Sequence, residues 1–261
     1  MYIMRFIAPI LFASLIGCRP AEAPGELDQL TGFLFVHAQD EDPDELEAGF
    51  VNLRAWMEDN LEETKEGFTV NNLSQEEAND LDACSRDITG LIGAAVASQS
   101  KYKVNPVVGV TVAGPTTEVF EGFLSYQREN VLNDADCFMD EDCELHHYDT
   151  FAVKQLPLNI QASTNNRTQH RWVETDEGLA HISRSWLMQP LSARPSWLKV
   201  RQQFYLSATI PWKGGDSIRL QAIWAITELG DAPVPESTAL NLAIGEMQKE
   251  AEIVEAWLDN Q

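Results

Sequence analysis

Two neighbouring segments near the end of the chain, residues 197–211 and 217–229, alternate between apolar and polar side chains. One set of alternate positions is apolar in both segments, with Gln202 as the exception: Leu198, Val200, Phe204, Leu206, Ala208, Ile210, Ile218, Leu220, Ala222, Trp224 and Ile226. This period of two is typical of an antiparallel sheet with one apolar face. Gly214 and Gly215 supply a hairpin turn between the segments. Another part of the chain must therefore cover the apolar face of this sheet.

A long amphipathic helix is predicted directly after these strands. Pro233 and Pro235 precede it, and its apolar residues recur every three or four positions: Leu240, Ile244, Met247, Ala251, Val254 and Leu258. Because this helix follows the sheet at once and carries a matching apolar stripe, we expect it to cover the apolar face.

The middle of the chain adds more predicted strands and one short helix. The β-branched run 107–112 predicts a strand, and the break at Gly114-Pro115 then predicts a helix that runs through Tyr126. Further strands are expected near residues 148–156, 158–164, 168–175 and 179–189.

Residues 31–104 are predicted to form a helical extension. Apolar residues at spacings of three and four follow Pro43: Leu46, Phe50, Leu53, Met57 and Leu61. Ser74 and Glu77 form a capping box, and the stripe behind it predicts a helix that continues to Ala95. The apolar run 33–36 is either a strand or the beginning of the packed region.

The N-terminus carries a short apolar segment that ends at a cysteine. Arg5 precedes eleven apolar or small residues, 6–16, too few to span a bilayer as a helix. The run Leu15-Ile16-Gly17-Cys18 resembles the lipobox of bacterial lipoproteins. The resemblance implies that residues 1–17 are a signal peptide and that Cys18 is acylated. The partner of Cys18 would then be the lipid bilayer of the bacterial cell envelope, with residues 18–30 as a tether. Arg19, in place of the aspartate that retains lipoproteins at the inner membrane, favours the outer membrane.

The order of elements from residue 105 onward resembles the START-like, or polyketide-cyclase-like, helix-grip superfamily. The opening segment 108–120 looks like the start of such domains, and a run of antiparallel strands and a long C-terminal helix follow it. The resemblance covers 105–261 and implies an α+β fold in which an antiparallel sheet wraps around the C-terminal helix. It further implies a cavity between sheet and helix for a lipid, sterol or polyketide-like ligand.

Six residues are candidates for binding such a ligand. Arg184, Trp186 and Met188 share one face of a predicted strand, and an arginine on an apolar face needs an anionic partner. That partner is either a ligand carboxylate or phosphate, or a carboxylate of the last helix such as Glu246 or Glu250; a solvent-exposed Arg184 is the third interpretation. The expected apolar lining completes the set: Leu206, Trp224 and Met247.

An acidic loop around residue 140 contains two of the four cysteines. Cys137 and Cys143 lie six positions apart, and an oxidising compartment lets them form a disulfide, although pairing of Cys84 with either of them stays open. Carboxylates are the ligands that calcium takes. We therefore weigh a calcium site against a loop ordered by the disulfide alone, at these residues: Asp134, Asp136, Asp140 and Asp142.

The net charge of the chain limits the classes of molecule that it is expected to bind. The net charge is −23 at pH 7, which disfavours binding to nucleic acid or anionic lipid. No phosphate-binding glycine loop, dinucleotide fingerprint or nucleophile elbow is present in the sequence. We therefore expect a lipoprotein that binds a small hydrophobic or amphipathic ligand and needs no cofactor. The alternatives are an interaction module with a filled core, whose protein partners the sequence does not identify, and a cyclase- or hydratase-like enzyme.

Overall fold

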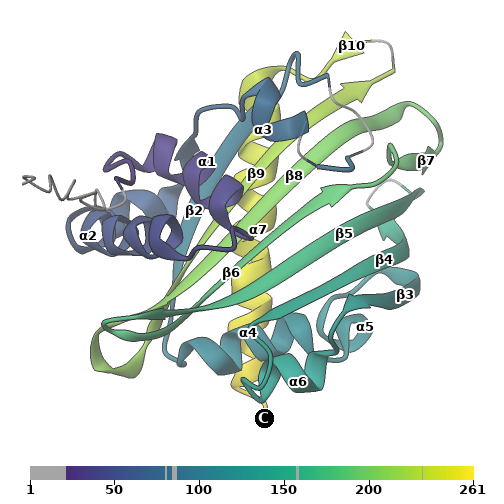
Figure 1. Ribbon diagram of the computed structural model, residues 1–261. Coiled ribbons are helices and arrows are strands. Elements are labelled where there is room, and N and C mark those ends of the chain that lie inside the picture. The colour runs from purple at the N-terminus through teal and green to yellow at the C-terminus, as the bar shows by residue number, and fades with distance from the viewer. Residues whose placement is uncertain (1–21, 80, 84–86, 157–158, 231) are drawn as a thin grey trace, which may run out of the picture.

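The computed structural model describes residues 22–79, 81–83, 87–156, 159–230 and 232–261. A mixed α+β fold is built on one antiparallel sheet with the strand order β1-β2-β9-β8-β6-β5-β4-β3 (Figure 1). β10 pairs with β9 and β7 pairs with β5 beside this path. The predicted α+β class with a long C-terminal helix is confirmed.

The strands of the sheet differ widely in length. Their bounds are β1 (Phe68–Thr69), β2 (Ile92–Ser100), β3 (Phe123–Leu132), β4 (Leu145–Leu156), β5 (Ile160–Thr175), β6 (Gly178–Leu187), β7 (Ser192–Arg194), β8 (Leu198–Pro211), β9 (Ser217–Leu229) and β10 (Ala232–Pro233). The predicted hairpin joins β8 and β9, and both of its glycines have positive φ angles, 77° at Gly214 and 92° at Gly215.

Seven α-helices surround the sheet in the described part of the chain. They are α1 (Leu27–His37), α2 (Asp44–Glu66), α3 (Gln75–Asn79), α4 (Val104–Val112), α5 (Thr116–Val119), α6 (Ala135–Met139) and α7 (Glu236–Leu258). α2 confirms the stripe predicted after Pro43, and Gly67, with a φ of 85°, ends it. The capping box is confirmed at α3: the Glu77 amide donates to Ser74 Oγ, and the Ser74 amide donates to the Glu77 carboxylate.

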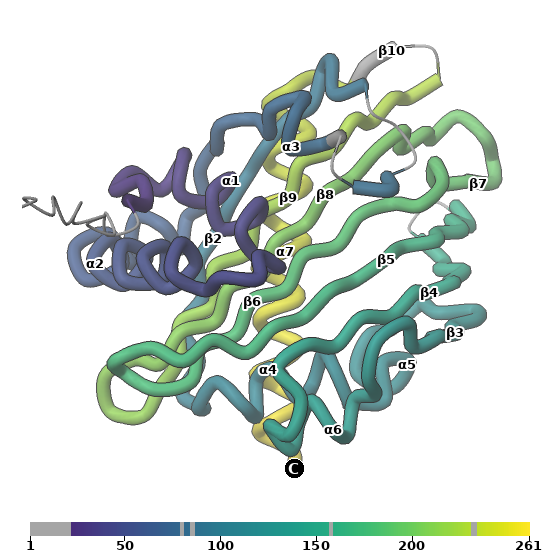
Figure 2. The backbone as a smooth tube through the Cα atoms, viewed as in Figure 1, coloured from purple at the N-terminus to yellow at the C-terminus, as the bar shows by residue number. Residues whose placement is uncertain are grey.

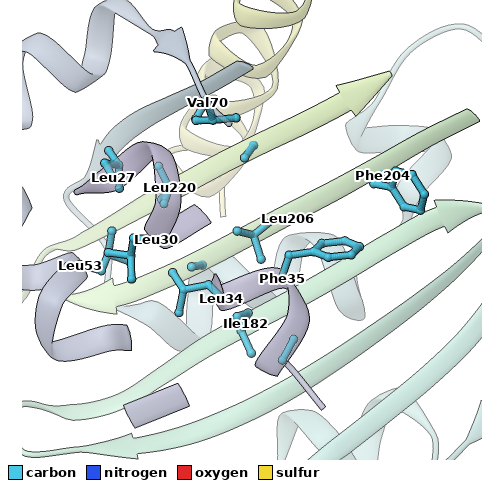
Figure 3. Close-up of a cluster of buried hydrophobic side chains, with 14 of the residues drawn as sticks. Leu27, Leu30, Leu34, Phe35, Leu53, Val70, Ile182, Phe204, Leu206 and Leu220 are labelled. Atoms are coloured by element: carbon cyan, nitrogen blue, oxygen red, sulfur yellow. The ribbon is translucent and has the colours of Figure 1, made fainter. Parts of the chain in front are cut away.

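The apolar face of the sheet packs against α1 and α2. Leucines of α1 point at Ile182, Leu206 and Leu220 of the sheet (Figure 3). Trp224 is fully buried there, with its ring 5.6 Å from that of Phe35. We call this side the α1 face. The expectation that the C-terminal helix covers the apolar face is therefore wrong, because α1 and α2 pack against that face and α7 packs against the other.

The opposite side of the sheet faces α7 and α4. Met247 of α7 packs there against Ala94 and Val96 of β2, with Tyr205 and Ile223 beside them. We call this side the α7 face. Its strands present many polar side chains, and these are buried all the same: His146, His170, His181, Ser183, Ser207, Thr209, Ser217, Arg219 and Gln221. The sheet thus has two covered faces, one apolar and one polar.

Several predicted elements are wrong in type or extent. Residues 107–112 belong to helix α4. Its valines at spacings of three and four share a side: Val104, Val108 and Val112 face α6 and Trp172, and Val107 and Val110 face α7, a pattern that the period of two in a strand cannot give. The helix that begins at Thr116 ends at Val119, and β3 follows. Two predicted strands are one long strand, β5.

The N-terminal part departs further from its predicted organisation. The helix predicted through Ala95 is confined to α3, and residues 92–100 form β2, which pairs with β9 along its whole length. Residues 33–36 lie in α1, which begins at Leu27, inside the segment expected to be a tether. The predicted helical extension therefore contributes a strand to the main sheet.

Strand β2 lies near the edge of the sheet that is close to α2, and β3 forms the opposite edge (Figure 2). β1 pairs with β2 only at Ala94 and Ala95. Beyond Ala95, no described strand pairs with the outer edge of β2. This edge, and the helix α7 next to it, position the site described below.

Candidate functional site

A groove of about 850 Å³ runs between the outer part of β2 and helix α7. Its lining combines apolar and polar side chains from both elements: Lys65, Val96, Ala97, Ser98, Gln99, Ser100, Lys101, Val107, Asp216, Arg219, Met247, Gln248, Ala251, Glu252, Val254 and Glu255. We call it the β2–α7 groove. Six consecutive residues of the β2 segment line it, from Val96 to Lys101, and consecutive side chains of a strand point to opposite faces. The groove therefore runs along the edge of the sheet and not across one face.

Helix α7 forms the apolar wall of the groove. Met247, Ala251 and Val254 follow one another at spacings of four and three, so they share one side of the helix. Gln248 closes one end, because its Nε2 donates to the carbonyl oxygen of Lys65 at 2.9 Å. The last turn of α2 and the middle of α7 are thereby held together across the edge of β2.

Arg219 is the charged group on the sheet side of the groove. Its Nε donates to Ser207 Oγ at 2.9 Å, and its Nη2 donates to Glu250 Oε1 at 2.6 Å and to Tyr205 Oη at 3.3 Å. Gln221 donates to the same tyrosine oxygen. Burial opposes the charge of Arg219, but Tyr205 and Glu250 outweigh it and raise the pKa of the guanidinium. Burial, aided by Glu250, also raises the pKa of Tyr205, so the phenol is neutral.

Four polar atoms around Arg219 are buried without a hydrogen-bond partner. Three belong to alternate residues of β9, whose side chains share the α7 face: Ser217 Oγ, Arg219 Nη1 and Gln221 Oε1. The fourth is Glu255 Oε1, on the α7 wall. Of these four residues, Arg219 and Glu255 line the β2–α7 groove. Because buried polar groups are nearly always paired with protein or water, a polar ligand in the groove would satisfy these two atoms.

A second, smaller groove of about 220 Å³ lies on the α7 face, near the β3 edge of the sheet. It is lined by strands β3, β4 and β5 and by Leu191, with Lys154 and Tyr126 as its largest polar side chains. The Lys154 ammonium lies 5.2 Å from the ring centre of Phe123. Its lining atoms offer fewer polar groups than the β2–α7 groove.

Three histidines form a closed cluster on the α7 face. His170 is hydrogen-bonded to His181 at 3.0 Å and to Tyr148 Oη at 3.2 Å, and His146 stacks against His170. Burial lowers the pKa of all three; that of His181 falls to about 3, with Arg219 adding to the effect. Phe138 of α6 covers the cluster and stacks on Trp172. None of these histidines lines either groove, so we interpret them as neutral core groups.

Five of the six predicted ligand residues lie on the α1 face, and Met247 lies apart from them. Trp186, Leu206 and Trp224 are buried in the apolar core under α1, and Met188 packs against that core. Met247 lies on the α7 face, on the other side of the sheet. The predicted lining assumed that the C-terminal helix covers the apolar face of the sheet. Because α1 and α2 occupy that face, only Met247 lines the β2–α7 groove.

Arg184 binds the end of helix α1. Its Nη1 donates to the carbonyl oxygens of Phe35 and Val36 at 3.0 and 3.1 Å, and its Nε donates to Gln169. A cation is favourable beside the carbonyl end of a helix, so this arginine fixes α1 on the sheet. Arg184 thus has a structural role at the end of α1, and a ligand role stays a prediction. Glu250, one of the two helix carboxylates considered as its partner, pairs with Arg219.

The acidic loop contains the predicted disulfide. Cys137 and Cys143 are bonded, with their Cα atoms 5.4 Å apart. Asp134 caps α6 by accepting a hydrogen bond from the Cys137 amide at 2.8 Å. In the described part of the chain, no three His, Cys, Asp or Glu side chains are grouped to hold a metal ion, so the calcium ligands proposed for this loop (Asp134, Asp136, Asp140 and Asp142) are not gathered. The predictions for Cys18 and Cys84 fall outside the described residues.

The polar residues of β9 were not among the predicted ligand residues, because a sheet with one apolar face was expected to leave its other face uncovered. One of these residues, Arg219, lines the groove. The signal that could have placed them is the number of amphipathic helices: the chain has apolar stripes both before and after a single sheet, and each stripe needs a face to cover.

No family model matches the sequence, and no curated protein matches it. Among solved structures, a START superfamily protein from Mycobacterium smegmatis has 10% identity and a TM-score of 0.42, covering 64% of this chain and 97% of that one. A STAR-related lipid transfer protein from Xanthomonas axonopodis has 10% identity and a TM-score of 0.44, covering 67% and 97%. The lipid transfer and protein localization domain of human StarD13 has 12% identity and a TM-score of 0.41, covering 77% and 95%.

Proposed function

We propose that this protein binds an elongated amphipathic ligand in the β2–α7 groove and performs no chemistry on it. The observation that carries the proposal is the groove itself, in which an apolar helix wall faces Arg219, and the lining atoms Arg219 Nη1 and Glu255 Oε1 are buried without a partner. A ligand with an apolar side and hydrogen-bonding groups would bury the first and satisfy the second. This site lies beside the C-terminal helix at the edge of the sheet, whereas the expected cavity lay between that helix and the apolar face.

Two features favour binding over catalysis. Two basic groups that line the groove are engaged in ion pairs: Arg219 with Glu250, and Lys101 with Asp259. The histidines with lowered pKa values lie outside both grooves. A general acid or base must reach a bound substrate, and these histidines line neither groove.

An interaction module is the second candidate. The observation that favours it is the α1 face, where Trp224, Phe204 and Leu206 are fully buried by the N-terminal helices. The core that the helix-grip resemblance implied to be hollow is packed on this side. In this alternative the β2–α7 groove is filled by water only.

A bulky side chain in the groove tests the ligand-binding proposal. Ala251 lines the groove from α7, so Ala251→Trp would fill it. We expect Nile red, an uncharged amphipathic dye, to bind the wild-type chain from residue 19, and Ala251→Trp to weaken binding at least about tenfold. Ala256→Trp is the matched control, since Ala256 is exposed on the same helix and does not line the groove.

Equal dye binding by wild type and Ala251→Trp would contradict the proposal. Native mass spectrometry of the protein purified from its own host adds a second readout. A co-purifying molecule lost in Ala251→Trp and retained in Ala256→Trp supports ligand binding, whereas an unliganded wild-type protein that also binds no dye supports the interaction module.

We further propose that the protein is held at the outer membrane of a bacterial envelope by acylated Cys18. No helix in the described residues has the length and apolar character needed to cross a membrane. Cys18→Ser would remove the acylation site. We expect the wild-type chain to sediment with membranes and to incorporate radiolabelled palmitate in cells, and Cys18→Ser to lose both properties. Palmitate incorporation that survives the substitution would contradict the anchor.

A further inference from the structure

The outer edge of β2 has main-chain hydrogen-bonding groups that face the groove. The Val70 amide donates to the carbonyl oxygen of Gly93 at 3.1 Å, which shows that Gly93 points away from β9. In an antiparallel strand this orientation alternates, so the odd-numbered residues of β2 point outward. The register between β2 and β9 is continuous from Ile92 to Ser100, and the alternation is therefore kept to the end of the strand.

Ala97 and Gln99 are the outward-pointing residues beyond the reach of β1. Within the described residues, no further strand pairs with them, and no hydrogen bond engages their main-chain N–H and C=O groups. Both residues line the β2–α7 groove. Ala97 is only 3% exposed, so its main chain is largely withdrawn from bulk water. Unpaired main-chain groups at a shielded strand edge favour the addition of another strand.

We propose that the ligand of the β2–α7 groove is an extended peptide segment that pairs with β2 as an additional strand. This inference rests on the proposed function and specifies its ligand class. A peptide supplies what a hydrocarbon ligand lacks, namely amides and carbonyls at the spacing of Ala97 and Gln99. Its side chains alternate, so every second one faces Met247 and Val254 on the α7 wall.

The charges around the groove favour a basic peptide. Glu252 and Glu255 on α7 and Asp216 after the β8–β9 turn line it, and Glu255 Oε1 is buried without a partner. Lys65 and Lys101 also line it, but each is paired with an acid, Glu62 and Asp259 respectively. A lysine or arginine of the peptide would satisfy Glu255, and a peptide carbonyl would accept from Arg219 Nη1. The net charge of −23 adds long-range attraction.

A pair of synthetic peptides tests the strand addition. The probe is a short fluorescein-labelled peptide of alternating valine and lysine with blocked ends. Its control has the same sequence with N-methyl groups on alternate amides, which keeps side chains and charge but removes the donors that a strand needs. We expect saturable binding of the probe in fluorescence anisotropy and binding about tenfold weaker for one of the two N-methyl registers. Equal binding by the probe and both N-methylated peptides would overturn the proposal.

Amide hydrogen exchange followed by NMR distinguishes strand pairing from electrostatic attraction alone, because attraction alone would not protect particular amides of β2. Saturating probe is expected to slow exchange at Ala97 and Gln99, and to leave Val96 and Ser98, whose amides face β9, unchanged. Glu255→Gln should weaken probe binding about threefold, and Glu246→Gln, on the exposed side of α7, should not. Unchanged exchange at Ala97 and Gln99 would overturn the strand pairing.

The outcomes also separate this inference from the proposed function. If Nile red binds and is lost in Ala251→Trp while the peptide protects neither Ala97 nor Gln99, the groove binds an amphipathic ligand of another class. If neither dye nor peptide binds, both proposals fail. Competition between the peptide and Nile red for the wild-type protein would place both ligands in the same groove.

Discussion

Replacing Trp224 by alanine is expected to lower the free energy of unfolding by about 3–5 kcal/mol. Trp224 is fully buried on the α1 face, where its ring meets Phe35 and its Nε1 donates to the Asn71 carbonyl oxygen at 2.8 Å. Truncation would leave a cavity between the sheet and α1 and an unpaired carbonyl. Chemical denaturation followed by circular dichroism measures the change.

The control for this prediction is Val51→Ala. Val51 is 60% exposed on α2, so its truncation should change the free energy of unfolding by no more than about 0.5 kcal/mol. A loss below about 1 kcal/mol in Trp224→Ala would contradict a closely packed α1 face. It would instead indicate that α1 and α2 are loosely held on the sheet.

Acidification is expected to destabilise the protein through the buried histidines. Burial lowers the pKa of His181 to about 3 and also lowers that of His170. Because the folded pKa lies below the unfolded value of about 6.5, the stability from a neutral His181 is present above pH 6.5 and is lost as the pH falls below it. Between pH 7.5 and 4.5 the loss from His181 is about 3 kcal/mol, at about 1.4 kcal/mol per pH unit below 6.5.

A comparison with His181→Gln isolates this contribution. The many carboxylates also titrate over this range, but they are common to both proteins and cancel in the difference. Denaturation at pH 7.5 and pH 4.5 should show that wild type loses about 2–3 kcal/mol more than the variant. Equal losses in the two proteins would show that His181 is protonated in the folded state without penalty.

The groove is harder to predict from the sequence than the core is. The core residues of β8 and β9 can be listed from their alternation, because burial on one face of a strand leaves a period of two in the sequence. The groove depends on β2, whose small residues Ala94, Ala95 and Ala97 carry no strand signal. Arg219, which lines the groove, looks solvent-facing in the sequence although it is buried.

Local sequence patterns determined much of the secondary structure. The Gly214-Gly215 hairpin, the capping box at Ser74, the stripes of α2 and α7 and the Cys137–Cys143 bond all follow from interactions between residues close in the chain. The valines of 107–112 are the counter-example, since packing against Val254 and Phe138 outweighs their strand propensity and makes a helix.

The sequence alone therefore determined that an antiparallel sheet with one apolar face is followed by an amphipathic helix. Only the tertiary structure decided which helix covers which face. An apolar stripe requires burial but does not specify a partner, because the hydrophobic effect has no direction. Helices α1 and α2 pack against the apolar face, and α7 packs against the polar face, beside the unpaired edge of β2. Because of this arrangement, Met247 and Trp224 lie on opposite faces of the sheet, and the groove lies between β2 and α7.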